Sequence, residues 1–524
     1  MLSVALLTPL IGFLVLLLIP SKQTATLRWT ANAAGIAGVL AFLPLFFQFR
    51  TDADFQFVEN IPWIPSIGAS YYIAMDGISL LLAGMTAIVG FLAILSSWNA
   101  IQNRQKEYYA NFLFLQFAAT GVFLARDLLL FFVFWELVLI PMYFIIAIWG
   151  GERRNYAAMK FLIYTSVGSV LMLLSLLALY YHHFSETGTL SFSMDALLTT
   201  PPGGQWAWYI FWGLFLGFAV KIPMFPFHTW LPDAHTEAPT AGSVVLASVL
   251  LKLGTYGLLR ISLPMLPDTA KDPVVVNTIA GISIVAIIYG ALVSLMQTDW
   301  KKLIAYSSIS HMGFCTLGIF AFNPAGIAGS VLQQVNHGIS TGMLFLVIGI
   351  VYERRHTRQI SEYGGLFKVM PLFGIVFLIA TLGSMGMPLL NGFIGEFTIL
   401  RGVLEVSTLW SFALVAGIAL GASYLLWLYQ RTMLGDVSEK NAKLLDLGWR
   451  EIAVFAPFIA FTFWIGLYPT PFFQVLERPS AQLVERIQPG YYASKGIPNP
   501  LTAGQPVQTT QQATITQPET AAVR

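Results

Sequence analysis

Four ionisable side chains interrupt long apolar runs in this chain of 524 residues: Glu136, Lys221, Lys252 and Glu396. A charged group at the centre of a membrane-spanning helix costs roughly 2.5–3.5 kcal/mol on insertion scales. Folding does not explain four such groups, because leucine would stabilise the helix better at each position. Buried carboxylates and amines are typical of a proton or ion path, so we interpret these residues as candidates for one.

Glu136 and Lys221 are the oppositely charged mid-span groups of the first half of the chain. Glu136 could also be a packing contact, hydrogen-bonded to a neighbouring helix. Lys221 lies two residues before Pro223, where the helix must open, so its amine could cap the freed carbonyls and still relay protons. Burial disfavours the charged form of each group and pairing favours it. Our hypothesis is that the two residues form a switchable pair close to the point of proton exchange.

Lys252 and three histidines extend this series. His228 lies in the proline-rich segment before Lys252, and His311 and His337 fall in later spans among Ser, Thr, Asn and Gln. A histidine titrates near neutral pH and passes protons through its two ring nitrogens. A lone buried histidine is more often a satisfied core residue. An ordered series of Lys, His, His and Glu through successive helices predicts a proton relay that ends at Glu396.

A redox role for the histidines is the main alternative, with His311 and His337 as axial haem ligands between two helices. We disfavour it because no second pair completes a two-haem relay, and the polar neighbours suit a wet channel better. The single cysteine, Cys315, excludes an internal disulfide, a CxxC pair and a thiolate-bound cluster. The sequence contains no G-x-G-x-x-G, P-loop or H-E-x-x-H motif. We therefore expect no cofactor and no metal in this chain.

The composition is that of a polytopic membrane protein. The chain is 56% hydrophobic and 10% charged, with a mean hydropathy of +0.70, whereas soluble domains carry about 25% charged residues. The net charge of +2 gives no indication of a nucleic-acid partner. The N-terminal run lacks a basic segment and a small-residue cleavage site, so we expect an uncleaved first span.

Apolar runs of spanning length predict an all-α protein with about 14 transmembrane helices. They lie near 2–20, 29–49, 74–97, 110–127, 128–149, 160–181, 208–226, 240–261, 275–297, 302–322, 328–351, 371–398, 408–430 and 451–469. Asp76 and Asp127 fall near span ends as capping or entry residues. After Pro471 the composition becomes polar, and residues 480–524 are predicted to be a disordered tail.

Two spans contain residues that interrupt a helix. The seventh carries Pro223, Pro226, Pro232 and Pro239, and the twelfth combines Pro388 with Gly383, Gly386, Gly392 and Gly395. Interrupted spans at matching places in two halves indicate a transporter built from inverted repeats. We predict N-terminal helices 1–3 in residues 1–109, a first repeat of five helices in 110–261, a second, inverted repeat in 275–430 and a last helix in 451–469.

The positions of Lys and Arg predict the orientation. With both termini on one side, seventeen Lys and Arg fall in the loops of the opposite side: Lys22, Arg28, Arg104, Lys106, Arg153, Arg154, Lys160, Lys301, Lys302, Arg354, Arg355, Arg358, Lys368, Arg431, Lys440, Lys443 and Arg450. Five fall in loops of the terminal side: Arg50, Arg126, Arg260, Lys271 and Arg401. The positive-inside rule places the termini away from the cytoplasm.

Four stretches resemble the antiporter-like membrane-arm subunits of the complex I family: FFVFWELVLIPMYF, AVKIPMFPFHTWLPDAHTEAPTAGSVVLASVLLKLGTYGLLR, DWKKLIAYSSISHMG and GMPLLNGFIGEF. The resemblance runs from about the third helix to the fourteenth. The chain is most similar to chain 4 of the plastid and cyanobacterial NAD(P)H–plastoquinone oxidoreductase. A glutamate rather than a lysine at the position of Glu396 marks the chain-4 type.

The resemblance implies 14 helices with two inverted five-helix repeats, each with a broken helix, and a proton-translocating subunit of that oxidoreductase. It implies that Glu136 and Lys221 are the coupling pair, Lys252 the central relay and Glu396 the terminal group; His228, His311 and His337 match the relay histidines. Plastoquinone, iron–sulfur clusters and the electron donor (NAD(P)H or ferredoxin) would belong to other subunits. The partners would be membrane-arm and peripheral-arm subunits, similar antiporter-like chains among them. The implied location is the thylakoid membrane of photosynthetic electron transport, with lumenal termini.

Two other functions remain open at this point. Related subunits occur in multisubunit Na⁺/H⁺ antiporters, where the same pair would serve cation exchange. Transport of a neutral solute is disfavoured because the buried polar groups are mostly titratable.

Overall fold

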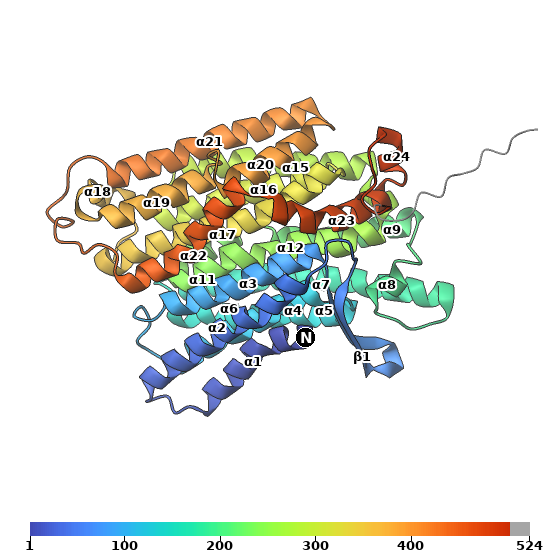
Figure 1. Ribbon diagram of the computed structural model, residues 1–524, viewed down its shortest axis with the longest axis horizontal. Coiled ribbons are helices and arrows are strands. Elements are labelled where there is room, and N and C mark those ends of the chain that lie inside the picture. The colour runs from blue at the N-terminus through green and yellow to red at the C-terminus, as the bar shows by residue number, and fades with distance from the viewer. Residues whose placement is uncertain (503–524) are drawn as a thin grey trace, which may run out of the picture.

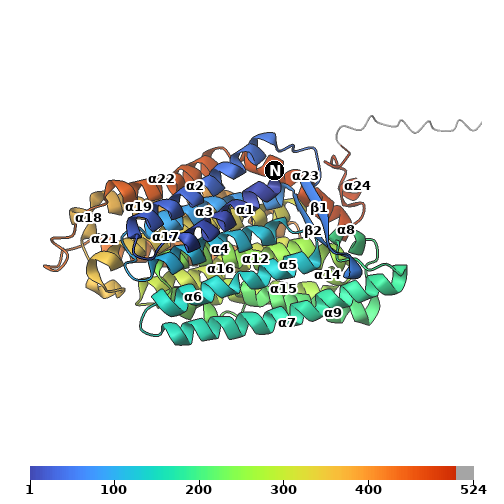
Figure 2. The same cartoon turned by 90° about the horizontal axis from the view of Figure 1, so that it is seen from below.

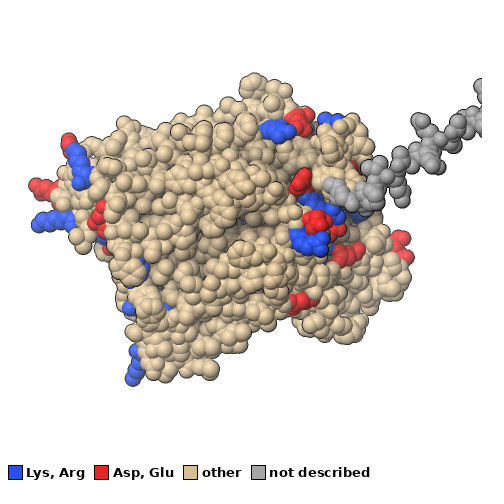
Figure 3. Space-filling view, in the orientation of Figure 1, with Lys and Arg blue, Asp and Glu red and all other residues tan. Residues whose placement is uncertain are grey.

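The computed structural model describes residues 1–502 as a bundle of long helices. Figures 1 and 2 show these helices running roughly alongside one another, between an end that carries α18 and an end that carries β1, α8 and α24. On the face in Figure 3 the charged side chains gather at these two ends and leave a broad uncharged band between them. A band of this kind is the surface that a membrane-spanning bundle presents to lipid.

The first half of the bundle contains these elements: α1 (Leu2–Leu18), α2 (Thr24–Gln48), β1 (Gln56–Ile64), η1 (Pro65–Ile67), β2 (Ala69–Met75), α3 (Gly77–Ser96), α4 (Gln105–Leu124), α5 (Leu128–Leu137), α6 (Leu139–Trp149), α7 (Arg154–Thr187), α8 (Met194–Leu197), α9 (Gly204–Lys221), α10 (Trp230–Glu237), α11 (Thr240–Val245), η2 (Leu246–Leu250), α12 (Leu251–Gly257), η3 (Leu258–Ser262), α13 (Leu263–Met265) and α14 (Pro267–Ala270). The second half contains α15 (Pro273–Leu295), α16 (Trp300–Ile319), α17 (Pro324–Arg355), η4 (Ile360–Glu362), α18 (Leu366–Val369), α19 (Pro371–Ser384), α20 (Asn391–Leu404), α21 (Thr408–Met433), α22 (Trp449–Leu467), α23 (Thr470–Ile487) and α24 (Tyr491–Lys495).

The predicted membrane spans correspond to helices or to interrupted helices. Within residues 1–502, nine helical stretches are long and apolar enough to cross a membrane unaided. The other predicted spans are helices that are shorter (α1), less apolar (α4 and α16) or broken (α9 with α10, and α19 with α20). The prediction of an all-α polytopic fold is confirmed, and the arrangement is consistent with 14 spans.

Both predicted helix interruptions are present. Residues 222–229 separate α9 from α10, and residues 385–390 separate α19 from α20. A third break, which the sequence reading missed, separates α5 from α6 at Val138. Its cause is Pro141, which has no N–H to donate to the carbonyl of Leu137.

A β-hairpin precedes α3, and the sequence reading did not predict it. β1 and β2 pair antiparallel, with Glu59 opposite Ile73 and Asn60 opposite Tyr72. Valine, isoleucine and aromatic residues in both segments favour strands, and η1 with Gly68 (φ +70°) makes the turn. The backbone N–H of Arg126 donates to the carbonyl of Tyr72 at 2.8 Å, so the hairpin is joined to the α4–α5 connection.

The predicted disordered tail is wrong for residues 480–495, which lie in α23 and α24. Leu476, Leu483, Val484 and Ile487 recur at helical spacing in α23 and are buried against the bundle. The polar residues that suggested a tail occupy the opposite face of this amphipathic helix. The rest of that prediction, at 503–524, lies outside the described residues.

Asp76 and Asp127 both cap helices, which resolves one of the alternatives left by the sequence. Asp76 accepts from the N–H of Ser79 at the start of α3, and Asp127 caps α5. Asp76 also forms a buried ion pair with Arg260 of η3, at 2.7 Å. This pair joins the start of α3 to the end of the helix that carries Lys252.

We expect Asp76→Ala to destabilise the fold by about 3–5 kcal/mol, because it leaves the Arg260 guanidinium buried without its partner. Thermal unfolding of the detergent-purified protein measures the effect. Asp52→Ala is the control. Asp52 pairs with Arg50 at 2.9 Å, but this pair is exposed to solvent, so its loss should leave the unfolding midpoint unchanged. Equal shifts for the two variants would contradict a structural role for the buried pair.

Candidate functional site

Glu136 occupies the last turn of α5, at the break before α6. Its side chain is partly buried, and its Oε1 atom has no hydrogen-bond partner within residues 1–502. The packing alternative, in which the carboxylate bonds to a neighbouring helix, is therefore not what the structure shows for this oxygen. An unpartnered buried acceptor is costly and is free to take up a proton.

Lys221 is the last residue of α9 and is 1% exposed. Its Nζ atom lies 5.2 Å from the centre of the Trp135 ring and 5.8 Å from that of Phe161. Nζ has no hydrogen-bond partner in the described chain. The carbonyl of Val220, freed by the helix break, accepts instead from Trp230 Nε1 at 2.9 Å. Lysine capping is thus not the reason for this residue.

Glu136 and Lys221 are neighbours but are not in contact. Among the described residues no salt bridge within 4.0 Å joins them, although Glu136 is the charged group that acts electrostatically on Lys221. Trp135, next to Glu136 in α5, packs against the lysine ammonium. The two residues therefore do not form the predicted ion pair in this structure, and their pairing stays a hypothesis.

His228 lies in the interrupted segment between α9 and α10 and is 3% exposed. Its ring packs against Phe225 and Tyr289, with ring centres 5.6 and 5.1 Å away. Nδ1 of His228 has no partner in residues 1–502. This histidine is close to the first predicted pair in sequence, but hydrogen bonds do not connect it to either member.

Lys252 lies in α12 between two π-helical turns, η2 and η3. It is fully buried, and its Nζ atom contacts His337 Nδ1 of α17 at 2.7 Å. The same Nζ donates to the carbonyl of Ala247, five residues earlier. A π turn widens the backbone and leaves such a carbonyl open to a side chain. Lys252 therefore joins the first half of the bundle to the second.

Glu396 completes this contact series in α20, after the second helix break. Its Oε1 atom lies 3.1 Å from His311 Nδ1 of α16 and accepts a hydrogen bond from Gln333 Nε2 at 3.1 Å. The rings of His311 and His337 have centres 5.6 Å apart. Lys252, His337, His311 and Glu396 thus form one buried row, which we call the central row.

Two glycines fit the backbone closely around Glu396. A Cβ at Gly386, which has φ +77°, would lie 2.6 Å from Glu396 Oε2. A Cβ at Gly395 would meet the side chains of Gln333 and Asn336. Asn336 of α17 and Asn391 at the start of α20 exchange hydrogen bonds between side chain and carbonyl, at 2.7 and 3.3 Å. The Glu396 carboxylate therefore lies close to the backbone of Gly386 on one side and accepts from the Gln333 amide on the other.

The sequence analysis missed His235, which lies in α10. It is fully buried, its ring stacks on Phe345 at 4.5 Å, and neither ring nitrogen has a partner in the described chain. It is close enough to feel the charges of Lys252 and Lys301. A signal was available, because His235 follows His228 by seven residues in the same quoted block.

With the geometry established, comparison with known proteins identifies the family. Residues 125–421 match the sequence model of the family described as NADH:quinone oxidoreductase/Mrp antiporter, TM. The chain is 43% identical to the NADH-quinone oxidoreductase subunit M of Rhodobacter capsulatus over 487 residues, 91% of this chain and 93% of the relative. It is 41% identical to the NADH-ubiquinone oxidoreductase chain 4 of Arabidopsis thaliana over 489 residues, 92% of this chain and 97% of the relative. A chain of respiratory complex I from Thermus thermophilus with bound NADH superposes with a TM-score of 0.85 at 29% identity, over 93% of this chain and all of that chain.

The chain belongs to this family. The residues that match the family model begin just before α5 and end within α21, so they include all seven predicted relay residues. The hairpin and α23 lie outside the matched residues. The resemblance to complex I membrane subunits is confirmed, and the protein is an integral membrane protein with many spans.

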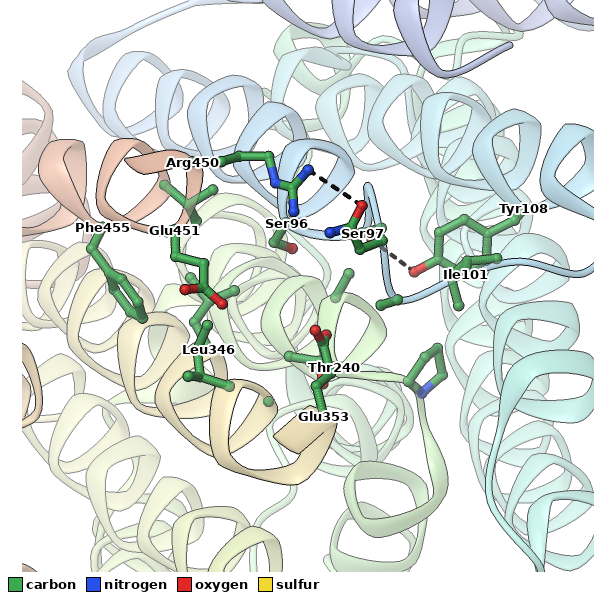
Figure 4. Close-up of a pocket in the computed structure, with 17 residues that line it drawn as sticks. Ser96, Ser97, Ile101, Tyr108, Thr240, Leu346, Glu353, Arg450, Glu451 and Phe455 are labelled. Carbon is green, nitrogen blue, oxygen red and sulfur yellow. Dashed lines mark hydrogen bonds between the residues drawn. The ribbon is translucent and has the colours of Figure 1, made fainter. Parts of the chain in front are cut away.

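A small pocket near the C-terminal ends of α3 and α17 contains none of the predicted site residues. Figure 4 shows it between α3, α11, α17 and α22, with Glu353 directed toward Thr240 and Arg450 bonded to Asn99. Its volume of about 50 Å³ holds one or two waters. We assign no relay step to this pocket.

We expect Glu136→Gln to abolish proton transfer through this subunit, because the amide cannot take up the proton that a carboxylate can. Glu136→Asp should keep part of the activity, since it keeps the carboxylate and only shortens its reach. Proton uptake by vesicles containing the assembled complex measures both. Equal activity of the Gln and Asp variants would contradict a proton-carrying role.

Proposed function

We propose that this chain is a proton-translocating membrane subunit of a complex I-like NADH–quinone oxidoreductase. The central row supports the proposal: a lysine, two histidines and a glutamate, all at least 95% buried, lie in contact order through α12, α17, α16 and α20. Four titratable groups in file at membrane depth are costly, and proton transfer is the role that uses them all.

Protons pass along the central row by exchange between neighbouring groups. The Lys252 ammonium faces His337 Nδ1 at hydrogen-bond distance and can give its proton to that nitrogen. His337 then releases a proton from Nε2, which has no partner in the described part of the chain, toward His311. His311 Nδ1 delivers one proton to Glu396 Oε1, and the terminal carboxylate releases it on the far side. Each step moves one proton and no electrons.

Glu136 and Lys221 set the charge state of this row in the proposed mechanism. While they are apart, the Lys221 ammonium has no counter-charge in contact and tends to lose its proton toward the histidines. Closing the pair holds both groups charged. Their separation in the structure corresponds to the releasing arrangement. An event elsewhere in the assembly would close the pair and reset it.

The redox chemistry belongs, in this proposal, to other subunits. The named relatives are subunits of NADH-quinone and NADH-ubiquinone oxidoreductases. The partners would be other antiporter-like membrane-arm chains and the peripheral-arm subunits that hold the electron donor, the iron–sulfur clusters and the quinone. The surrounding lipid bilayer is the remaining partner.

Na⁺/H⁺ antiport is the second candidate, because the family description includes Mrp antiporters. Sodium, like other hard cations, prefers oxygen ligands. Three of the four members of the central row present nitrogen instead. Proton uptake that requires sodium would favour antiport, whereas uptake coupled to quinone reduction without sodium would favour the complex I function.

Lys221→Ala tests the proposed function directly. We expect it to abolish proton transfer through this chain while the complex still assembles, since Lys221 makes no hydrogen bond that the fold needs. Proton uptake per quinone reduced, in vesicles containing the complex, is the measurement. Lys440→Ala, in an exposed loop, is the control and should pump normally. Normal pumping by the Lys221 variant would overturn the relay.

The finer assignment is a plastoquinone-reducing complex of the thylakoid membrane, with both termini on the lumenal side. The glutamate at 396 and the charge bias of the loops support it. The structure adds Arg478, Arg486 and Lys495 on α23 and α24 to the terminal side, where Arg478 pairs with Asp54 and the Met1 amine with Glu59. Seventeen basic residues then oppose eight, which keeps the same orientation.

Quinone specificity of the purified complex checks this assignment. We expect plastoquinone analogues to be reduced faster than ubiquinone analogues, with ferredoxin or NAD(P)H as donor. Faster reduction of ubiquinone would place the chain in a respiratory complex and leave the proton relay unaffected. Protease accessibility of an epitope on α24 in sealed membranes checks the side on which the C-terminal helices lie.

A further inference from the structure

A polar cavity opens at the end of the bundle that is rich in Lys and Arg. It has a volume of about 460 Å³ and lies between the α6–α7 connection, α10, the start of α16 and the segment after α17. Half of its lining residues carry a charge: Glu152, Arg153, Asp233, Glu237, Asp299, Lys302 and Arg358. A space of this size and polarity holds water. None of the predicted relay residues lines it.

Asp233 connects this cavity to the buried part of the bundle. It lies in α10, two residues before His235, and its Oδ2 atom contacts Lys160 Nζ of α7 at 2.7 Å. The two side chains are only 20% and 27% exposed. The Lys160–Asp233 pair is therefore partly desolvated, which strengthens the attraction between the two charges, while Asp233 still reaches the water of the cavity.

Tyr289 and Tyr306 lie on helices next to this pair and His228. Tyr306 is on α16, which packs against both α10 and α15. Tyr289 is on α15, and its ring centre lies 5.1 Å from that of His228. Each side chain has a hydroxyl that can accept a proton and pass one on.

We propose that the Lys160–Asp233 pair is the gate through which protons enter the relay from the cavity, with Tyr306 and Tyr289 leading from it to His228. This proposal rests on the proposed proton-translocating function. It assigns the residues that admit the proton, whereas the relay assigned above begins at the buried groups.

The transfer uses one proton and no electrons. Water in the cavity gives a proton to the Asp233 carboxylate, which weakens its hold on the Lys160 ammonium. Neutral Asp233 passes that proton to a tyrosine hydroxyl, which releases its own proton onward. His228 Nδ1, which has no partner in residues 1–502, accepts it. Asp233 is then a carboxylate again and closes on Lys160, which keeps its own charge throughout.

The pair also limits how often Asp233 is protonated. With the pair closed, the Lys160 ammonium stabilises the ionised carboxylate, so protonation of Asp233 from either side is infrequent. Protonation from the water-filled cavity opens the pair. A structural ion pair without this role would stabilise α7 against α10 and do nothing more.

Asp233→Asn in the intact complex tests the proposal. We expect proton uptake per quinone reduced to fall to the level of Lys221→Ala, because the amide still bonds Lys160 but carries no proton. Asp233→Glu should restore more than half of the activity, a rescue that a purely structural pair would not require. Asp436→Asn, on an exposed loop of the same end, is the matched control and should pump normally.

Tyr306→Phe is a second variant that keeps all charges, and so remains informative if Asp233→Asn fails to assemble. It removes one hydroxyl and should slow proton uptake without changing the amount of complex. Normal pumping by Asp233→Asn, or by Tyr306→Phe where Asp233→Asn does not assemble, overturns the gate if Lys221→Ala is inactive. Normal pumping by Lys221→Ala as well would overturn the proposed function itself.

Discussion

Every backbone N–H and C=O in the bilayer must find a partner within the protein, and this constraint organises the site. The helix break after Lys221 leaves the carbonyl of Val220 open, and the Trp230 indole bonds it. The π turn before Lys252 leaves the carbonyl of Ala247 open, and this carbonyl accepts a hydrogen bond from Lys252 itself. Next to the break before Glu396, Asn391 at the start of α20 exchanges hydrogen bonds with Asn336 of α17. Backbone groups at these three irregular places are therefore bonded by side chains in or next to the site.

The breaks and the charges explain one another. An uninterrupted helix offers no polar groups to a buried lysine or glutamate, so its charge would stay uncompensated. An opened turn offers carbonyls and N–H groups that stabilise the charge without a full counter-ion. Lys252 uses the open carbonyl of Ala247 in this way. Lys221 does not, because Trp230 bonds the open carbonyl of Val220 and the Lys221 ammonium has no hydrogen-bond partner among residues 1–502.

The sequence predicted the residues of the site better than their contacts. Six of the seven relay candidates lie in the expected helices and His228 lies in the expected proline-rich break, since intramembrane charges are conspicuous against an apolar background. The link between Lys252 and His337 depends on how α12 packs against α17, which a single sequence does not encode in any local pattern. The π turns likewise lack a sequence signature.

His235 and the α5–α6 break at Pro141 had visible signals, but the first was overlooked among four prolines and the second inside an apolar run. The hairpin and α23 were missed because attention to hydropathy hides short strands and amphipathic helices.

The two glycines beside Glu396 extend the site beyond the residues that carry chemistry. Oε2 of Glu396 lies 2.6 Å from where a Cβ of residue 386 would be, and a Cβ at Gly395 would meet the side chains of Gln333, which bonds the carboxylate, and Asn336. A side chain at position 386 would displace the carboxylate directly, and one at position 395 would displace the amide that bonds it. A substitution at a glycine, which has no functional group, would thus change the position of the Glu396 carboxylate. Around this carboxylate, the positions without a side chain are therefore as constrained as the positions that carry charge.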